Sequence, residues 1–99
     1  MDTNIVSARI GERLKPIFNE YDVKKAILFG SYAKGIADNK SDIDICVDSG
    51  LRGLRFLSLC MDIHLELGVE VDLFDISHIE KGSRVEDEIS ATGVVIHEK

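Results

Sequence analysis

The segment Asp42–Asp48 alternates strictly, with isoleucine or valine at every second position and aspartate or cysteine between them. Successive side chains of a β-strand point to opposite faces, so this pattern predicts a strand with one apolar and one mostly acidic face. Carboxylates at positions i and i+2 then lie about 7 Å apart on the same side. Two like charges this close are costly unless the face is open to solvent or a cation binds them. The pattern alone fits both explanations.

Helical and strand periodicities alternate along the chain. Apolar residues recur every three or four positions in a helix and every second position in a strand. In chain order we expect a helix at Asp2–Tyr21, a strand at Lys24–Phe29, a helical turn opened by Gly30-Ser31, the strand at Asp42–Asp48, a helix at Leu54–Leu67, a strand at Val69–Ile76, a weakly helical segment at Ser77–Thr92 and a short last strand in VVIHE. This order predicts a small α/β or α+β domain in which helices pack on a sheet.

Two of the expected helices depart from a simple amphipathic pattern. Gly11 and Pro16 fall inside the first one, and because an interior proline removes a backbone hydrogen bond, we expect a kink or a late start near Lys15. In the helix at Leu54–Leu67 the apolar side chains cover a wide arc. We expect this helix to be covered on two sides, by the sheet and by the first helix or another chain. Its polar sector comprises Arg55, Ser58, Asp62 and Glu66.

Composition limits the size and setting of the protein. The 99 residues, 44% of them hydrophobic, suffice for one core, so we expect a single domain over residues 1–99. The formal net charge of -6 argues against direct, nonspecific binding to nucleic acid. We recognise no signal peptide and no membrane-spanning run, so the expected location is cytoplasmic, without a membrane partner. Cys46 and Cys60 lie in apolar patterns and are expected to be reduced core residues.

A glycine-serine pair stands before the acidic strand. At Gly30 and Ser31 the chain passes from a strand into a helical turn. Backbone N–H groups at such a point can bind an anion, and glycine lets a phosphate approach closely. A plain helix cap is the alternative interpretation.

A third carboxylate, Asp72, lies in a separate predicted strand, on the face opposite Val71 and Leu73. If that strand lies beside the acidic one, then Asp42, Asp44 and Asp72 converge. Carboxylates with open positions around them suit Mg²⁺, and two such ions can clamp the attacking and leaving oxygens of a phosphoryl or nucleotidyl transfer.

Other motifs do not fit the chain. It has neither a P-loop nor a dinucleotide-binding glycine motif. Reading DICVDSG as a calcium loop puts Cys46 at a ligand position and ends the loop on Arg55 instead of glutamate. Cys60 and His64 stand four residues apart on a helix, but two ligands do not make a zinc site, so we interpret them as core or interface residues.

Gly30-Ser31, ten intervening residues and then Asp42-x-Asp44 resemble the G-S-x10-D-x-[DE] signature of the polymerase-β-like nucleotidyltransferases. More closely, the chain is similar to the minimal nucleotidyltransferases, the MNT family. The resemblance covers nearly the whole chain, from the first helix through LFGSYAKG, SDIDICVD and VEVDLFD to GVVIHE. It implies a small mixed β-sheet with flanking helices.

The resemblance also implies roles for single residues. Gly30 and Ser31 would bind the β- and γ-phosphates of a nucleoside triphosphate. Asp42, Asp44 and Asp72 would be the catalytic carboxylates and would hold two Mg²⁺ ions. Asp72 would in addition help to deprotonate the attacking hydroxyl.

One position departs from the family pattern. Lys34 stands where members often carry arginine, and it would contact phosphate without the bidentate geometry of a guanidinium. A solvated surface lysine is the alternative. Asp48 continues the acidic face but lies outside the signature, so it is left out of the predicted metal set.

Minimal members resembling this chain are antitoxins that form a hetero-oligomer with an all-helical HEPN toxin. The implied reaction transfers AMP from ATP to a tyrosine hydroxyl of that toxin and releases pyrophosphate. Two alternatives remain at this point. The protein could be a binding module that neutralises its partner by steric masking, or a small-molecule nucleotidyltransferase that borrows its acceptor pocket from a second subunit.

Overall fold

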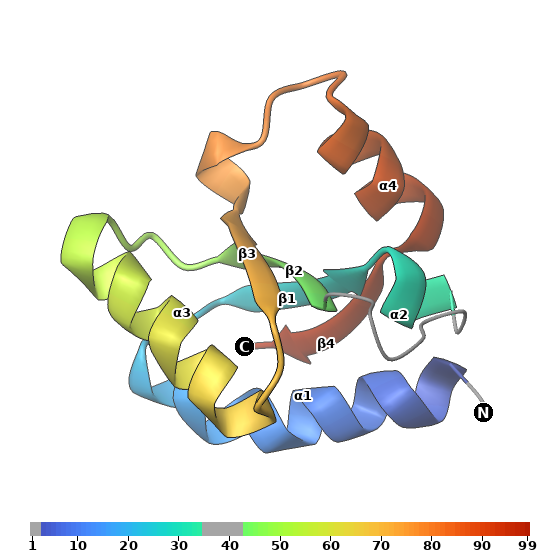
Figure 1. Ribbon diagram of the computed structural model, residues 1–99. Coiled ribbons are helices and arrows are strands. Elements are labelled where there is room, and N and C mark those ends of the chain that lie inside the picture. Colours follow the sequence, from blue (N-terminus) through green and yellow to red (C-terminus); the bar gives the residue numbers. More distant parts are fainter. Residues whose placement is uncertain (1–2, 35–42) are drawn as a thin grey trace.

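The computed structural model describes residues 3–34 and 43–99 and forms a four-stranded mixed sheet with helices on both faces (Figure 1). The predicted α+β fold and its order of helices and strands are confirmed. The elements are α1 (Thr3–Glu20), β1 (Lys25–Phe29), α2 (Ser31–Lys34), β2 (Ile43–Asp48), α3 (Gly53–Leu67), β3 (Val71–Asp75), the short 3₁₀ helix η1 (Ile76–His78), α4 (Arg84–Thr92) and β4 (Val94–Glu98).

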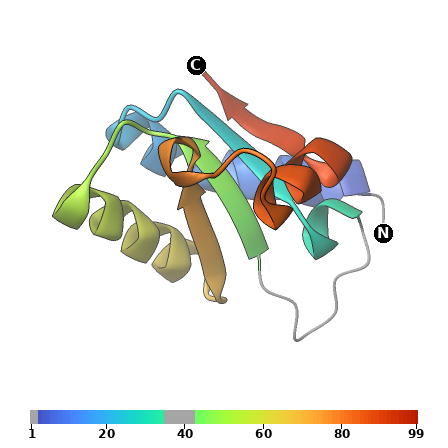
Figure 2. The same ribbon diagram turned by 90° about the horizontal axis from the view of Figure 1, so that it is seen from above.

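The sheet has the strand order β3-β2-β1-β4. β1 is antiparallel to both β2 and β4, whereas β2 and β3 run parallel and are joined by the crossover helix α3. Figures 1 and 2 show α1 and α3 along one face, while α4 lies on the other face near β1. Within residues 3–34 and 43–99, no helix is long and apolar enough to cross a membrane.

The hydrophobic core lies between the sheet and the pair α1 and α3. The helical stripe predicted for α1 is buried there from Ile10 onward. The predicted alternation of β2 is also confirmed, because its isoleucines and Val47 point into this core. The largest fully buried side chains are Phe18, Phe29, Leu14, Leu28, Ile45, Leu59, Ile63, Val23 and Val47.

The expected late start of the first helix is wrong, because α1 begins at Thr3 and continues through both Gly11 and Pro16. Gly11 is needed because α1 and β4 pack closely against each other at this position. A Cβ atom on Gly11 would stand 2.5 Å from the carbonyl oxygen of Ile96. Glycine is therefore required here for close approach of the last strand, not for an interruption of the helix.

Among the described residues α3 packs against both the sheet and the α1 region, as expected, but a third face of the helix is uncovered. Leu59 and Ile63 are buried against the core. The polar sector faces α1, where Tyr21 hydrogen-bonds Ser58 and Asp62 with its hydroxyl. The opposite, apolar face of the helix is open to solvent, and its exposed side chains are Leu54, Leu57, Met61 and Leu65.

Both cysteines are free thiols, as predicted. Cys46 is buried in the sheet, and burial, followed by the negative charges of Asp75 and Asp48, raises its pKa to about 11. Burial also raises the pKa of Cys60. Both groups therefore stay protonated at neutral pH.

Candidate active site

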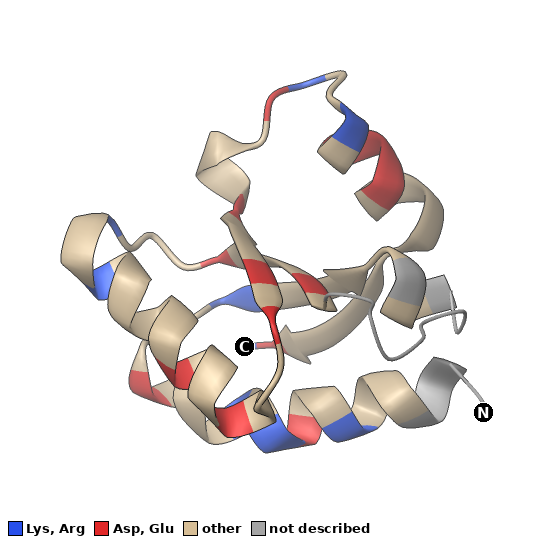
Figure 3. Cartoon of the chain, in the orientation of Figure 1, with Lys and Arg blue, Asp and Glu red and all other residues tan. Residues whose placement is uncertain are grey.

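Asp44 and Asp72 lie directly beside each other on parallel strands. They are register partners in the β2–β3 pair, and Figure 3 shows acidic residues adjacent on these two strands. The condition stated for convergence of the carboxylates, that the strand of Asp72 lies beside the acidic strand, is therefore met for Asp44 and Asp72. Because paired residues of neighbouring strands point to the same face, the two carboxylates share one side of the sheet.

These two carboxylates line a pocket of about 570 Å³ between the sheet and α4. Carboxylate oxygens in an open pocket suit Mg²⁺, which keeps several waters and recruits phosphate oxygens. The described part of the chain contains no group of three or more potential ligands; Asp42 lies outside the described residues. The lining residues are Phe29, Gly30, Asp44, Asp72, Phe74, Arg84, Val85 and Glu88.

Gly30 connects β1 to α2 and lies beside Asp44. Its φ angle is +77°, which disfavours any residue with a side chain. A Cβ atom here would stand 2.6 Å from Oδ2 of Asp44. Two features therefore require glycine at this position: the positive φ angle and the close approach of the Asp44 carboxylate.

The N–H of Gly30 is not a free anion donor, contrary to the simplest form of the phosphate-site interpretation. It donates to Oγ1 of Thr92 at 2.9 Å, and the Thr92 hydroxyl donates in turn to the carbonyl of Glu88 at 2.7 Å. This link fastens the end of α4 to the turn. The backbone N–H of Gly30 is therefore already paired within the fold.

The remaining predicted residues are described in part or not at all. Ser31 and Lys34 are the first and last residues of α2, so the predicted strand, turn and helix are present. Their side chains lie outside the described part of the structure, as does Asp42.

α4 supplies pocket residues that the sequence analysis missed. Arg84, Val85 and Glu88 line the pocket opposite the carboxylates, and Arg84 pairs with Glu88 at 3.5 Å. The only signal in this region was a weak helical periodicity at Ser77–Thr92. Nothing in it indicated that the first turns of the helix face the acidic strands.

A further carboxylate on β3, Asp75, is built into the fold. It is 2% exposed and accepts four hydrogen bonds, two from the N–H groups of Ser49 and Ser77 and two from their hydroxyls. Burial alone would raise the pKa of this carboxyl, but the hydrogen bonds outweigh burial and hold the pKa below its usual value. Asp75 therefore joins β3 to the loop after β2.

Comparison with known proteins identifies the class. Residues 12–99 match the family model described as "Polymerase beta, Nucleotidyltransferase". The chain therefore belongs to the polymerase β nucleotidyltransferase family, as the glycine-serine and aspartate motifs predict.

Individual proteins similar to this chain have more specific names than the family does. A Methanocaldococcus jannaschii protein named "putative protein adenylyltransferase" is 36% identical over 72 residues, which span 71% of this chain and 77% of that protein. A chain in the crystal structure of a toxin-antitoxin with AMP-PNP has a TM-score of 0.74 and 23% identity, over 90% of this chain and 73% of that one. The structure titled as a tri-AMPylated Shewanella oneidensis HEPN toxin with an MNT antitoxin gives a TM-score of 0.68 and 20% identity, over 94% and 73%. The two structures share the fold of this chain.

Proposed function

We propose that the protein is an Mg²⁺-dependent protein adenylyltransferase that acts as the antitoxin of a HEPN toxin. The observation that carries this proposal is the register pair Asp44 and Asp72, which lines one pocket together with Gly30. The relative named as a protein adenylyltransferase supports a protein acceptor. The neighbour whose title pairs an AMPylated HEPN toxin with an MNT antitoxin supports the kind of partner.

The proposed reaction joins the tyrosine oxygen of the toxin to the α-phosphorus of ATP. Asp72 accepts the hydroxyl proton as the new oxygen–phosphorus bond forms. The bond between the α-phosphorus and the oxygen bridging to the β-phosphate breaks, and pyrophosphate leaves. Mg²⁺ held by Asp44 and Asp72 with Asp42 would neutralise the phosphate charge.

The triphosphate would lie above the turn between β1 and α2. Gly30 leaves room there for phosphate, and the proposed contacts come from Ser31 and Lys34. Arg84 lines the same pocket from α4, where it pairs with Glu88. With this arrangement the pyrophosphate leaves on the β1 side of Asp44.

The test is the mass of the partner toxin after incubation of the complex with ATP and Mg²⁺. We expect a mass increase equal to one or more AMP groups. Asp44→Ala should abolish the increase. Asp48→Ala is the matched control, because Asp48 lies on the same strand and does not line the pocket, and it should leave the increase unchanged.

A second candidate is neutralisation by steric masking, favoured by the exposed apolar face of α3. It predicts that Asp44→Ala still protects cells from the toxin. A partner whose mass never changes, while the complex still forms, would rule out the adenylylation mechanism. Transfer of AMP to hydroxyl-bearing small molecules but not to the toxin would instead support a small-molecule enzyme.

A further inference from the structure

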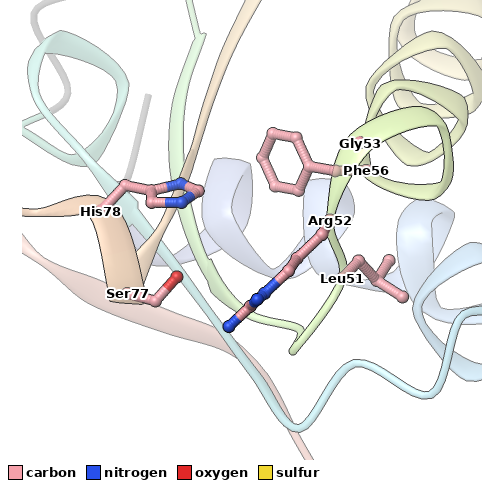
Figure 4. A pocket seen from close by; sticks show the side chains of 6 residues that line it. All are labelled: Leu51, Arg52, Gly53, Phe56, Ser77 and His78. Atoms are coloured by element: carbon pink, nitrogen blue, oxygen red, sulfur yellow. The ribbon is translucent and has the colours of Figure 1, made fainter.

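A second cavity, of about 430 Å³, lies at the other end of the β2–β3 pair, between the start of α3 and η1. Figure 4 shows Arg52 entering it from the α3 side, and Ser77 and His78 from η1, with the imidazole facing the ring of Phe56. The described lining residues carry no carboxylate. In a chain with a net charge of -6, this cavity presents nitrogen donors over an apolar floor.

Arg52 and His78 are the polar side chains of this cavity that could bind a ligand, because the hydroxyl of Ser77 already donates to Asp75. Within residues 3–34 and 43–99, neither Arg52 nor His78 takes part in an ion pair. The nearby carboxylate Asp75 already accepts four hydrogen bonds from serines. The Arg52 cavity therefore favours an anionic group that comes from outside the chain.

A smaller cavity of about 160 Å³ connects this region with the candidate active site. It shares Phe56 and His78 with the Arg52 cavity and shares Phe74 with the Asp72 pocket. Leu73 and Phe74, whose side chains lie on opposite faces of β3, both line it. By their shared lining residues, the three cavities form a row that leads from Asp72, past the end of β3, to Arg52.

The proposed chemistry places the acceptor on this side. The attacking oxygen and the leaving pyrophosphate stand on opposite sides of the transferred phosphorus. Gly30, Asp44 and Asp72 lie on or directly after β1, β2 and β3, which are consecutive in the sheet. With the leaving phosphates above Gly30, the acceptor hydroxyl approaches Asp72 from the edge of β3.

We propose that this row of cavities is the acceptor-binding groove, and that it takes an extended polypeptide with an acidic side chain bound between Arg52 and His78. The proposal rests on the adenylyltransferase function proposed above. Ser77 stands five positions after Asp72, at most about 16 Å away because the chain is extended only as far as Asp75. The acidic residue of the acceptor therefore lies about five positions from the modified tyrosine.

The test uses the full chain, ATP, Mg²⁺ and synthetic decapeptides that carry tyrosine with glutamate five positions before or after it. Matched peptides carry lysine in place of glutamate. We expect the KM for AMP transfer to be about tenfold lower for the glutamate peptide in one of the two orders. Arg52→Glu should reverse this preference. Arg55→Glu makes the same charge change in the first turn of α3, three positions after Arg52 and outside the cavity, and should keep the preference.

Binding of AMP-PNP, measured on every variant, separates this proposal from the proposed function. Transfer without any preference for glutamate, or a preference unchanged in Arg52→Glu, overturns the groove proposal alone. AMP-PNP binding without transfer to any peptide also overturns it, because the groove then does not take an extended acceptor. Loss of both binding and transfer in the wild-type chain would overturn the nucleotidyl-transfer function itself.

Discussion

Asp72 and Asp75 stand three residues apart on β3, yet their surroundings are opposite. Asp75, at the end of the strand, is buried and has both oxygens occupied by hydrogen bonds from two serines. Asp72, near its start, is exposed and faces Asp44 in the neighbouring strand. A carboxylate whose oxygens are all occupied stabilises the fold and offers nothing to a ligand. A carboxylate beside another carboxylate costs stability and is available to a cation.

This difference separates two uses of one residue type within a single strand. The apolar residues of β3 alternate with Asp72 and Phe74, so Asp75 falls on the face toward α3. There it also caps η1 by accepting from the N–H of Ser77. The carboxylate that stabilises the sheet, Asp75, and the carboxylate proposed to act in catalysis, Asp72, therefore lie toward opposite ends of β3.

The sharpest test of the comparison is amide replacement at each position. Asp75→Asn puts an NH₂ group against a backbone N–H, and we expect it to lower the free energy of unfolding by about 2–3 kcal/mol. Asp72→Asn should change it by less than about 0.5 kcal/mol, on the stabilising side, because a like-charge neighbour is removed. Urea denaturation of both variants measures the difference. Equal losses at the two positions would contradict the comparison.

The sequence predicts most of the fold because its patterns are local. The alternation in β2 follows from residue spacing and the order of helices and strands from the change of period, whereas the placement of Asp72 beside Asp44 remained a condition that the sequence could not decide. Gly11 was misleading. A glycine inside a helical pattern indicates a break in the helix, but here glycine is needed because Ile96, 85 positions away in the chain, packs directly against it. Propensity is a weak prior that such tertiary packing overrides.

The candidate site was predicted less completely for the same reason. Gly30 and Asp72 belong to recognisable patterns, and the structure brings both against Asp44. Thr92 and Arg84 belong to no motif, and they reach the site only because α4 packs near β1. The side of an amphipathic helix that meets a given strand end depends on how the sheet is assembled. Residue spacing alone does not give this information.

A smaller effect is expected from Gly30→Ala, which affects the end of the sheet where Asp72 lies. The left-handed backbone and the contact with Asp44 together should cost about 1–2 kcal/mol of unfolding free energy. Gly50→Ala is the matched control, since Gly50 also has a positive φ but an added Cβ would meet nothing within 4 Å. The excess loss at Gly30, measured by thermal unfolding, reports the contact with the carboxylate. An equal loss at both glycines would mean that backbone strain alone accounts for it.

The smallest expected effect is a change in how stability depends on pH. The pKa of Asp75 is lower in the folded chain than its ordinary value of 3.8, so the folded state binds this proton less readily than the unfolded state does. The stability that Asp75 contributes is therefore fully present above that ordinary value and is lost as pH falls through the folded pKa. Asp75→Asn should flatten this part of the stability curve, measured by urea denaturation from pH 5 down to about 2. A curve that Asp75→Asn leaves unchanged would mean that other groups cause this loss of stability in acid.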